Sequence, residues 1–327
     1  QQRLYEKEGS IMNWKQPKVY AVKHKDEMTR AASRSGGIFT ALSDQVLSNG
    51  GVVYGCVLTE EFDAVHIRTD NAEDRNRMRG SKYIQSKLGD TFKSVKTDLD
   101  AKKSVLFSGT SCQVAGLKKY IGKEYDNLFC VDIVCHGVPS KKIWEAYLRW
   151  QEQKMHSKVA SVDFRNKKDF GWHDHVETLC FENGKSTSSR VFKELFYGHT
   201  VLRPSCYECP YKSVIHPGDI TIADYWGIEK AAPEFDDNKG VSLVLVNNEA
   251  GEIIFEKVND LLKQVGISKV VYKPVPVIYH LLPAQEDLYV LFRYMNAKLI
   301  GRNISSTIYQ GNKIKFIESR KSGIRKA

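Results

Sequence analysis

The sequence predicts an α/β fold, a mixed sheet with flanking helices, followed by a cysteine-bearing α+β region toward the C-terminus. Two observations predict it. Over residues 36–134, apolar residues at helical spacing alternate with short apolar or period-two segments. Beyond residue 153, short strand-like segments follow one another with little helix between them. Strand, helix and strand in succession favour parallel pairing in the first part, and the second part favours an antiparallel or mixed sheet.

Turn residues and apolar spacing mark the elements of the first part. Leu42, Val46 and Leu47 form one face of a helix that ends at the Gly50-Gly51 pair. The following elements alternate between apolar strands and amphipathic helices. In chain order they are strands over 52–58 and 64–68, a helix over 88–99, a strand over 104–107, a helix over 112–120 and a strand over 128–134.

The second part begins after a polar helix over 144–153. Its expected strands alternate apolar and polar residues and are followed by one amphipathic helix. They cover 159–164, 176–181, 186–191, 220–222 and 241–246, and the helix covers 249–265. A domain boundary is expected near Ser104 or, alternatively, near Gln153. With the first choice, the regions are 18–104 and 105–275, followed by a helical, basic tail over 276–327.

Composition narrows the class of protein. The chain has 327 residues, of which 42% are hydrophobic and 27% are charged, as in a globular protein with a proper core. It contains neither an apolar run of membrane-spanning length nor an N-terminal signal region, so we expect a cytoplasmic protein that does not bind membranes. The net charge of +10 favours nucleic acid, an acidic partner or a phosphorylated cofactor. Because no basic face has interleaved aromatic residues, we expect no nucleic-acid binding.

Seven cysteines without a secretory signal make metal binding a better hypothesis than disulfide pairing. Cys206 and Cys209 form a C-x-x-C followed by Pro210, a pattern that holds metal centres and closes iron–sulfur ligand runs. The alternative is a thioredoxin-like redox pair. That pair needs a strand entering a helix, and here the flanking residues form a proline-rich loop.

Two further cysteines lie where neighbouring strands are expected to end. Cys112 begins a helix, whose N-terminus favours a thiolate, and Cys135 follows the strand over 128–134. The sequence therefore offers one set of four metal-binding thiolates, Cys112, Cys135, Cys206 and Cys209. Spacing alone leaves zinc and an iron–sulfur cluster both open. The remaining cysteines fall in apolar strand patterns and are expected to be buried, namely Cys56, Cys130 and Cys180.

Small-residue turns before helices are candidate phosphate sites, because backbone amides there approach a ligand closely. Each of these segments also has an ordinary reading as a helix start, an exposed loop or core. The first turn is Ser35-Gly36-Gly37 with Thr40, and the second is Ser108-Gly109-Thr110. Between them, Ser81-Lys82-Tyr83 offers a cation for a phosphate and a ring for stacking. Tyr225 and Trp226 could wall a flat ring.

Six motifs, in order and spacing, resemble the beta-subunit family of coenzyme F420 hydrogenases and dehydrogenases. The resemblance covers residues from about 18 to 246. The motifs are Ser35-Gly36-Gly37, Arg79-Gly80-Ser81-Lys82-Tyr83, Phe107-Ser108-Gly109-Thr110-Ser111-Cys112-Gln113, Cys135-His136-Gly137-Val138-Pro139-Ser140, Arg203-Pro204-Ser205-Cys206-Tyr207-Glu208-Cys209 and Asp219-Ile220-Thr221-Ile222-Ala223-Asp224-Tyr225-Trp226-Gly227.

The resemblance implies an oxidoreductase with a flavin, FAD or FMN, next to a 4Fe–4S cluster. It assigns the cluster to the four cysteines already selected. Flavin binding is assigned to the region 18–104 and to the three segments above, that is to Ser35, Gly36, Gly37, Thr40, Ser81, Lys82, Tyr83, Ser108, Gly109 and Thr110. It further implies a second electron carrier, either F420 or a redox partner protein such as ferredoxin. It assigns no catalytic residue. The alternative function is a zinc-stabilised scaffold or binding protein without redox activity.

The sequence also departs from the family pattern. Many relatives have an N-terminal ferredoxin module rich in cysteine, whereas this sequence has no cysteine before Cys56; either the module is absent or the sequence begins after it. The proline that precedes the first ligand in the family is Ser111 here. The family's Gly-Asp-Phe-Trp-Gly is Ala223-Asp224-Tyr225-Trp226-Gly227, a change that affects the expected ring pocket.

Overall fold

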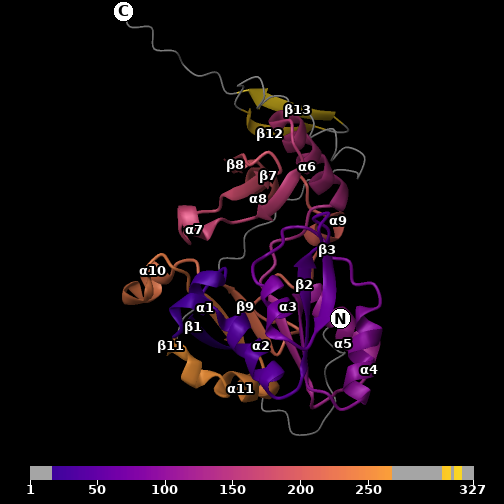
Figure 1. The fold of residues 1–327 in the computed structure, drawn as a ribbon, viewed down its shortest axis with the longest axis vertical. Coiled ribbons are helices and arrows are strands. Elements are labelled where there is room, and N and C mark those ends of the chain that lie inside the picture. Colours follow the sequence, from indigo (N-terminus) through magenta and orange to yellow (C-terminus); the bar gives the residue numbers. More distant parts are fainter. Residues whose placement is uncertain (1–16, 267–303, 311–312, 319–327) are drawn as a thin grey trace, which may run out of the picture.

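The computed structural model describes residues 17–266, 304–310 and 313–318, the last two ranges by their backbone alone. Within these residues the fold is α/β, as the sequence predicts, with a large mixed sheet and flanking helices (Figure 1). A smaller region with its own three-stranded sheet lies above one edge of the large sheet in this view.

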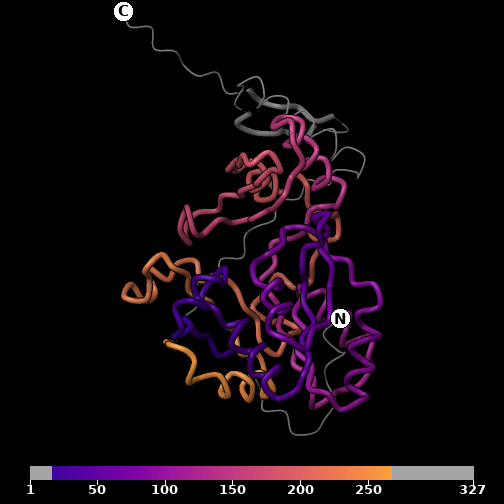
Figure 2. Tube along the Cα trace, viewed as in Figure 1, coloured from indigo at the N-terminus to yellow at the C-terminus, as the bar shows by residue number. Residues whose placement is uncertain are grey.

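The strands of the large sheet, in spatial order, are β11 (Leu262–Gly266), β1 (Lys18–His24), β10 (Ser242–Val246), β9 (Ile220–Asp224), β5 (Leu128–Ile133), β4 (Val105–Thr110), β2 (Val52–Leu58) and β3 (Ala64–Thr69). The four central strands β9, β5, β4 and β2 are parallel, and every other pair is antiparallel. The sequence patterns did not predict β1. Figure 2 shows its indigo chain beside the orange chain, which comes more than 200 residues later in the sequence, as its pairing with β10 and β11 requires.

Helices cover both faces of the large sheet. They are α1 (Glu27–Ala32), α2 (Ile38–Ser48), α3 (Ala72–Arg77), α4 (Thr91–Asp100), α5 (Ser111–Ile121), α10 (Ile228–Ala231) and α11 (Glu249–Glu256). Strand β4 shows why two cores form. Leu106 packs with α2 and α11 on one face, while Val105 and Phe107 pack with α4 and α5 on the other. Alternate side chains of a strand point to opposite faces, so a strand buried on both sides is apolar throughout.

The smaller region is the connection between the parallel strands β5 and β9. It contains α6 (Lys141–Met155), β6 (Val159–Asp163), α7 (Lys167–Phe170), β7 (Glu177–Phe181), β8 (Ser186–Ser189), α8 (Val191–Tyr197) and α9 (Pro204–Tyr207). Its core is aromatic: the fully buried Trp144 of α6 packs against Phe164 and Phe192, with ring centroids 4.8 and 5.0 Å away. The region therefore has a hydrophobic core of its own.

Three expectations about organisation need correction. A boundary between 104 and 105 does not divide the fold, because β2 and β4 on its two sides are hydrogen-bonded neighbours. The helix expected over 249–265 ends at Glu256, and β11 follows it. In the tail over 276–327, the helical expectation is wrong for two ranges, which form the antiparallel strands β12 (Ile304–Gln310) and β13 (Lys313–Glu318). Isoleucine and an aromatic residue occur in both ranges and favour strands. The other residues of that tail lie outside the described residues.

Candidate functional site

The candidate site lies at the carboxyl edge of the parallel strands. Residues at the ends of β4, β5 and β9 are neighbours there, because these strands pair directly and run in one direction. The turn Ser35-Gly36-Gly37 reaches the same edge: the Gly36 amide donates to the Ser242 hydroxyl at 2.9 Å, and Ser242 pairs with Asp224 at the end of β9. Open α/β sheets place ligands along this edge.

Cys112 lies in the first turn of α5, with its side chain exposed. Thr110 is the N-cap of this helix, and its backbone N–H donates to Gln113 Oε1 at 2.9 Å in a capping box. The Thr110 hydroxyl lies 3.1 Å from Cys112 Sγ. Helix N-termini and hydroxyl donors both stabilise a thiolate, so this position suits a metal ligand.

Cys135, Cys206 and Cys209 come together because the loop after β5 is paired with the loop that leads into α9. Pro139 and Leu202 form a β-bridge, and the Arg203 amide donates to the Val138 carbonyl at 2.9 Å. Gly137 fits between these loops with a φ of 140°; a Cβ there would come within 2.8 Å of Leu202 and 3.4 Å of Cys206.

The thiols of the four cysteines are near enough to influence one another. Solvent reaches Cys135, yet protein surrounds it closely, and this desolvation raises the pKa of its thiol to about 12. Cys206, Cys112 and Cys209 add smaller contributions that raise this pKa further. Burial also raises the pKa of Cys206, to which Cys112 and Cys209 again contribute. The four thiols therefore lie near one another at a place that solvent reaches, which we call the thiol recess.

The spacing of the thiols bears on what they could hold. Among the described residues, no three His, Cys, Asp or Glu side chains are close enough together to hold a single metal ion. Four sulfurs around one zinc ion, with bonds of about 2.3 Å, would lie only about 3.8 Å apart. In a four-iron cluster each cysteine binds a different iron, so the sulfurs are further apart. The described thiols are therefore too far apart for one zinc ion as they stand, and thiolate sulfur is a ligand type that iron–sulfur clusters use.

The other cysteines differ in burial. Cys130 is fully buried, as expected, and Cys56 is half-buried. The expectation that Cys180 is buried is wrong, because its side chain is exposed. In β7, Leu179 and Phe181 point into the core of the smaller region, and the intervening residue therefore points to solvent.

The glycine turn before α2 is held tightly by the protein itself. Ser35 Oγ donates to the Val241 carbonyl at 2.6 Å, and the buried Thr40 hydroxyl accepts from Arg79 Nε at 3.0 Å. A Cβ on Gly36 would lie 2.0 Å from the Val22 carbonyl oxygen. Gly37, with a φ of 93°, is the N-cap of α2. Close packing on β1 and β10 is thus sufficient to require glycine at position 36.

The segment Ser81-Lys82-Tyr83 follows α3. Ser81 is exposed, and the Lys82 ammonium donates to the carbonyls of Arg77, Met78 and Arg79 at 2.9, 3.0 and 3.1 Å. Burial lowers the pKa of Lys82 to about 8. The ammonium therefore caps the end of α3, where a cation is favourable.

Tyr83 lies between the thiol recess and a polar cluster. Its ring centroid is 5.1 Å from that of Phe196, which is 5.0 Å from the ring of His136, next to Cys135. On its other side, Tyr83 is near Arg165. Burial lowers the pKa of the Arg165 guanidinium, but the charges of Asp224 and then of Tyr83 raise it, and the net shift is upward.

Ser108, Gly109 and Thr110 end β4 and belong to a hydrogen-bonded network that the sequence did not predict. His66 Nε2 donates to the Ser108 carbonyl at 3.0 Å, so its Nδ1 accepts from Ser86 Oγ at 2.9 Å. Gln113 Nε2 completes the network by donating to Ser86 at 2.8 Å. The network fixes the turn that positions Cys112.

This network predicts a pH dependence of stability. Burial lowers the pKa of His66 to about 4, well below its ordinary value near 6.5. Between these values the unfolded state binds more protons than the folded state, so stability rises with pH across the window and is lost as pH falls through it. His66→Gln, which does not titrate, should remove up to about 3 kcal/mol of the stability lost between pH 7 and pH 4. Urea unfolding across this range measures the difference; parallel profiles for both proteins would refute the assignment.

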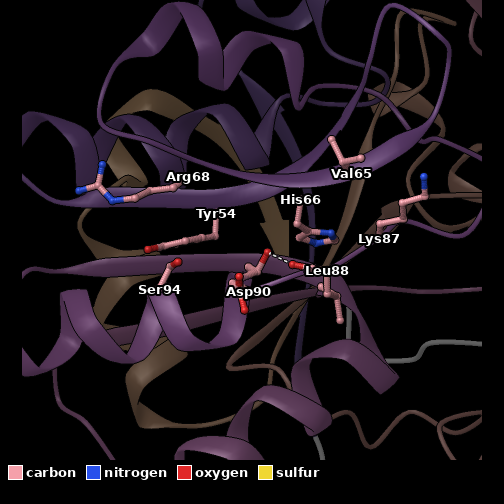
Figure 3. A pocket seen from close by; sticks show the side chains of 10 residues that line it. Tyr54, Val65, His66, Arg68, Lys87, Leu88, Asp90 and Ser94 are labelled. Atoms are coloured by element: carbon pink, nitrogen blue, oxygen red, sulfur yellow. Dashed lines mark hydrogen bonds between the residues drawn. The ribbon is translucent and has the colours of Figure 1, made fainter.

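Figure 3 shows a pocket beside the same histidine, with His66 and Lys87 toward one end and Arg68 toward the other. It has a volume of about 330 Å³ and is open to solvent. Several of its polar groups already have partners; Tyr54 and Arg68, for example, both bond Asp98, at 2.6 and 2.7 Å. The pocket touches none of the four cysteines of the thiol recess.

Sequence reasoning missed two further groups near the strand ends. The buried Asp132 bonds His216 Nδ1 at 3.1 Å, and the same nitrogen lies 3.0 Å from Ser111 Oγ, so the chain after Cys209 is tied to the start of α5. A carboxylate within the apolar strand over 128–133 was the available signal. The second group joins Arg165 to Asp224 in a buried ion pair, and Trp172 Nε1 donates to the same carboxylate at 2.9 Å.

In the described part of the chain, no helix combines the length and apolar character required to cross a membrane.

Comparisons with known proteins agree with this fold. The family model for the C-terminal part of the beta subunit of coenzyme F420 hydrogenase/dehydrogenase matches residues 102–265, half of the chain. No curated protein matches the sequence. A similar solved structure is that of the F420-reducing [NiFe] hydrogenase complex from Methanosarcina barkeri, studied by xenon derivatization, with a TM-score of 0.53 and 18% identity. The match covers 88% of this chain and 91% of that one. With half of its length matched by the family model, the chain belongs to the coenzyme F420 hydrogenase/dehydrogenase beta-subunit family, whose chemistry is oxidation and reduction.

Proposed function

We propose that the protein is an iron–sulfur flavoprotein that passes electrons between a 4Fe–4S cluster, a flavin and a second carrier. The observation that supports this most directly is the thiol recess, where four cysteines from separate parts of the chain approach one another at the carboxyl edge of the sheet. Membership of an oxidoreductase family makes redox work a better account of these thiols than a structural role.

Cys112, Cys135, Cys206 and Cys209 would hold the cluster, which supplies one-electron transfer when bound. The protein's part is to fix the thiols and limit their contact with water. The N-terminus of α5 and the Thr110 hydroxyl favour negative charge on the Cys112 sulfur. Cys206 and Cys209 are half-buried, which limits the contact of their side chains with water.

The flavin, FAD or FMN, would lie along the same edge, and when bound it would supply chemistry that links two-electron and one-electron transfer. The residues expected to contact the flavin differ in whether their polar groups are free to bind it. The polar groups of Ser35, Thr40 and Lys82 already have protein partners. Gly37 at the start of α2, the exposed Ser81, the ring of Tyr83 and the turn Ser108-Gly109-Thr110 remain as the candidate contacts. Tyr83 would place the ring system between the thiol recess and Arg165.

The second carrier would be an F420-like molecule or a docked protein such as ferredoxin. The similar solved structure is part of a hydrogenase complex, which favours a protein partner. The net charge of +10 suits an acidic carrier, because complementary charge accelerates encounter and is screened by salt.

Anaerobic purification of the whole chain tests the proposal. We expect about four iron atoms and a similar amount of sulfide per chain, together with a flavin released on denaturation. Reduction by an acidic ferredoxin should slow as salt rises. A colourless protein with one zinc ion per chain would instead establish the scaffold alternative, and iron without flavin would remove the flavin from the proposal.

A further inference from the structure

Arg34 and Arg165 leave hydrogen-bond donors without partners. Arg34 lies between α1 and the glycine turn, and its Nη1 donates to the backbone carbonyl of Arg165 in the smaller region. Three nitrogen atoms of the two guanidinium groups are buried without a partner among the described residues, namely Arg34 Nε, Arg34 Nη2 and Arg165 Nε. A buried donor without an acceptor is destabilising, so such groups are uncommon and their positions are informative.

Positive charge exceeds negative charge around these donors. Arg165, whose side chain is 2% exposed, has one carboxylate partner, Asp224. Nearby, the Lys167 ammonium donates to the carbonyls of Arg30, Ser33 and Lys239 rather than to an acid. Burial, and then the neighbouring charge of Arg165, lowers the pKa of Arg34 to about 10. Among the described residues, Asp224 is the carboxylate that pairs directly with this cluster, through Arg165, whereas Asp163 and Asp237 act on Arg34 and Lys167 only from farther away.

A purely structural clamp does not explain the arrangement. Lys167 by itself joins the smaller region to the loop after α1, and its donors are satisfied. A second clamp of two arginines adds like charges and leaves donors unbonded. An oxyanion between the guanidinium groups would both neutralise them and accept their hydrogen bonds, and guanidinium donors match phosphate in geometry.

We propose that Arg34 and Arg165 form a phosphate-binding subsite for a phosphorylated ligand of the redox site. This inference rests on the proposed function. The phosphate would belong either to the flavin or to the second carrier. The subsite lies beside the Ser35-Gly36-Gly37 turn, and Trp226, 51% exposed, connects it with the surface. The Arg165 guanidinium lies 4.9 Å from the Trp226 ring centroid, which in turn stacks on Trp172 at 5.1 Å.

The test compares ligands that differ only in phosphate. FMN and riboflavin share one ring system, and sodium pyrophosphate has the anion without the ring. Titration of purified wild type and Arg34→Met should show FMN and pyrophosphate binding weakened about 10- to 100-fold, with riboflavin unchanged. Arg34→Lys keeps the charge without the planar fork and should show a smaller loss. Arg77→Met, at an exposed arginine of α3, is the matched control and should bind as wild type does.

The unfolding temperature provides an independent test, because the substitution should weaken ligand binding without lowering the stability of the ligand-free protein. Without ligand, Arg34→Met should unfold at the same temperature as wild type or higher, because it removes a buried charge with unbonded donors. Pyrophosphate should raise the unfolding temperature of wild type but not of the variant.

The outcomes separate this inference from the proposed function. Wild type that binds pyrophosphate through Arg34 but binds no flavin would retain the subsite and reject the flavin. If only pyrophosphate binding depends on Arg34, the subsite stands and the phosphate belongs to the second carrier. Equal binding of FMN and pyrophosphate by wild type and Arg34→Met would overturn the subsite, as would an equal loss of riboflavin.

Discussion

Replacing Cys135 by serine should reduce the iron content from about four atoms per chain to nearly none and abolish the brown colour. Cys135 is the thiol whose pKa the three others raise, so it shares the recess with all of them. Without it, one iron of the cluster would lack a thiolate and the cluster should not assemble. Iron, sulfide and visible absorbance after anaerobic purification measure the result, and circular dichroism checks that the variant has folded.

Cys180→Ser is the matched control for this experiment. Cys180 is also a solvent-exposed cysteine, but it lies on β7 in the smaller region. It is not among the thiols that raise the pKa of Cys135. The control should retain all its iron. A Cys135→Ser protein with a full complement of iron, or a Cys180→Ser protein without it, would show that the recess is not the cluster site.

Replacing Gly36 by alanine should destabilise the protein by about 3 kcal/mol or more. The added Cβ would lie 2.0 Å from the Val22 carbonyl oxygen and 2.6 Å from the Ser242 amide nitrogen. Both are backbone atoms of the paired strands β1 and β10 inside the large sheet, so neither can move without breaking the ladder. Urea unfolding should therefore show a lower midpoint in the absence of any ligand.

Gly116→Ala makes the same chemical change in a different environment. Gly116 lies within α5, and its added Cβ would contact Phe92 at an ordinary 3.5 Å. Because alanine favours helix more than glycine does, this variant should be more stable by about 1 kcal/mol. If Gly36→Ala were equally harmless, Gly36 would not be packed against β1, and its role would have to come from a ligand.

Gly36 shows the limit of reading turns from sequence. The motif Ser35-Gly36-Gly37 indicates that the backbone lies close to another group, and the sequence alone suggests that this group is the phosphate of a ligand. The structure shows that at Gly36 the approaching group is the protein's own backbone. For a similar reason, Lys82 was predicted as a phosphate contact, whereas its ammonium caps the carbonyls at the end of α3. Whether a ligand also contacts these segments stays a prediction.

The sequence by itself determined the elements whose signals are local. Strands β2, β4 and β5 and helix α5 are read from apolar periodicity and turn residues, and Cys112 and Cys135 are read as strand-end residues from the same pattern. The C-x-x-C motif is local as well. These features depend on residues a few positions apart, so one chain segment contains all the information they need.

Only the tertiary structure decided which segments meet. The pairing of β1 with β10, the approach of the Cys206 loop to Cys135, and the contact of Arg34 with Arg165 join residues that are 60 to more than 200 positions apart, and no local periodicity encodes them. It also decided that Cys180 faces solvent, because the sheet to which β7 belongs buries only its other face. Side-chain burial and partner choice depend on how the layers pack, which is a property of the assembled fold and not of any one segment.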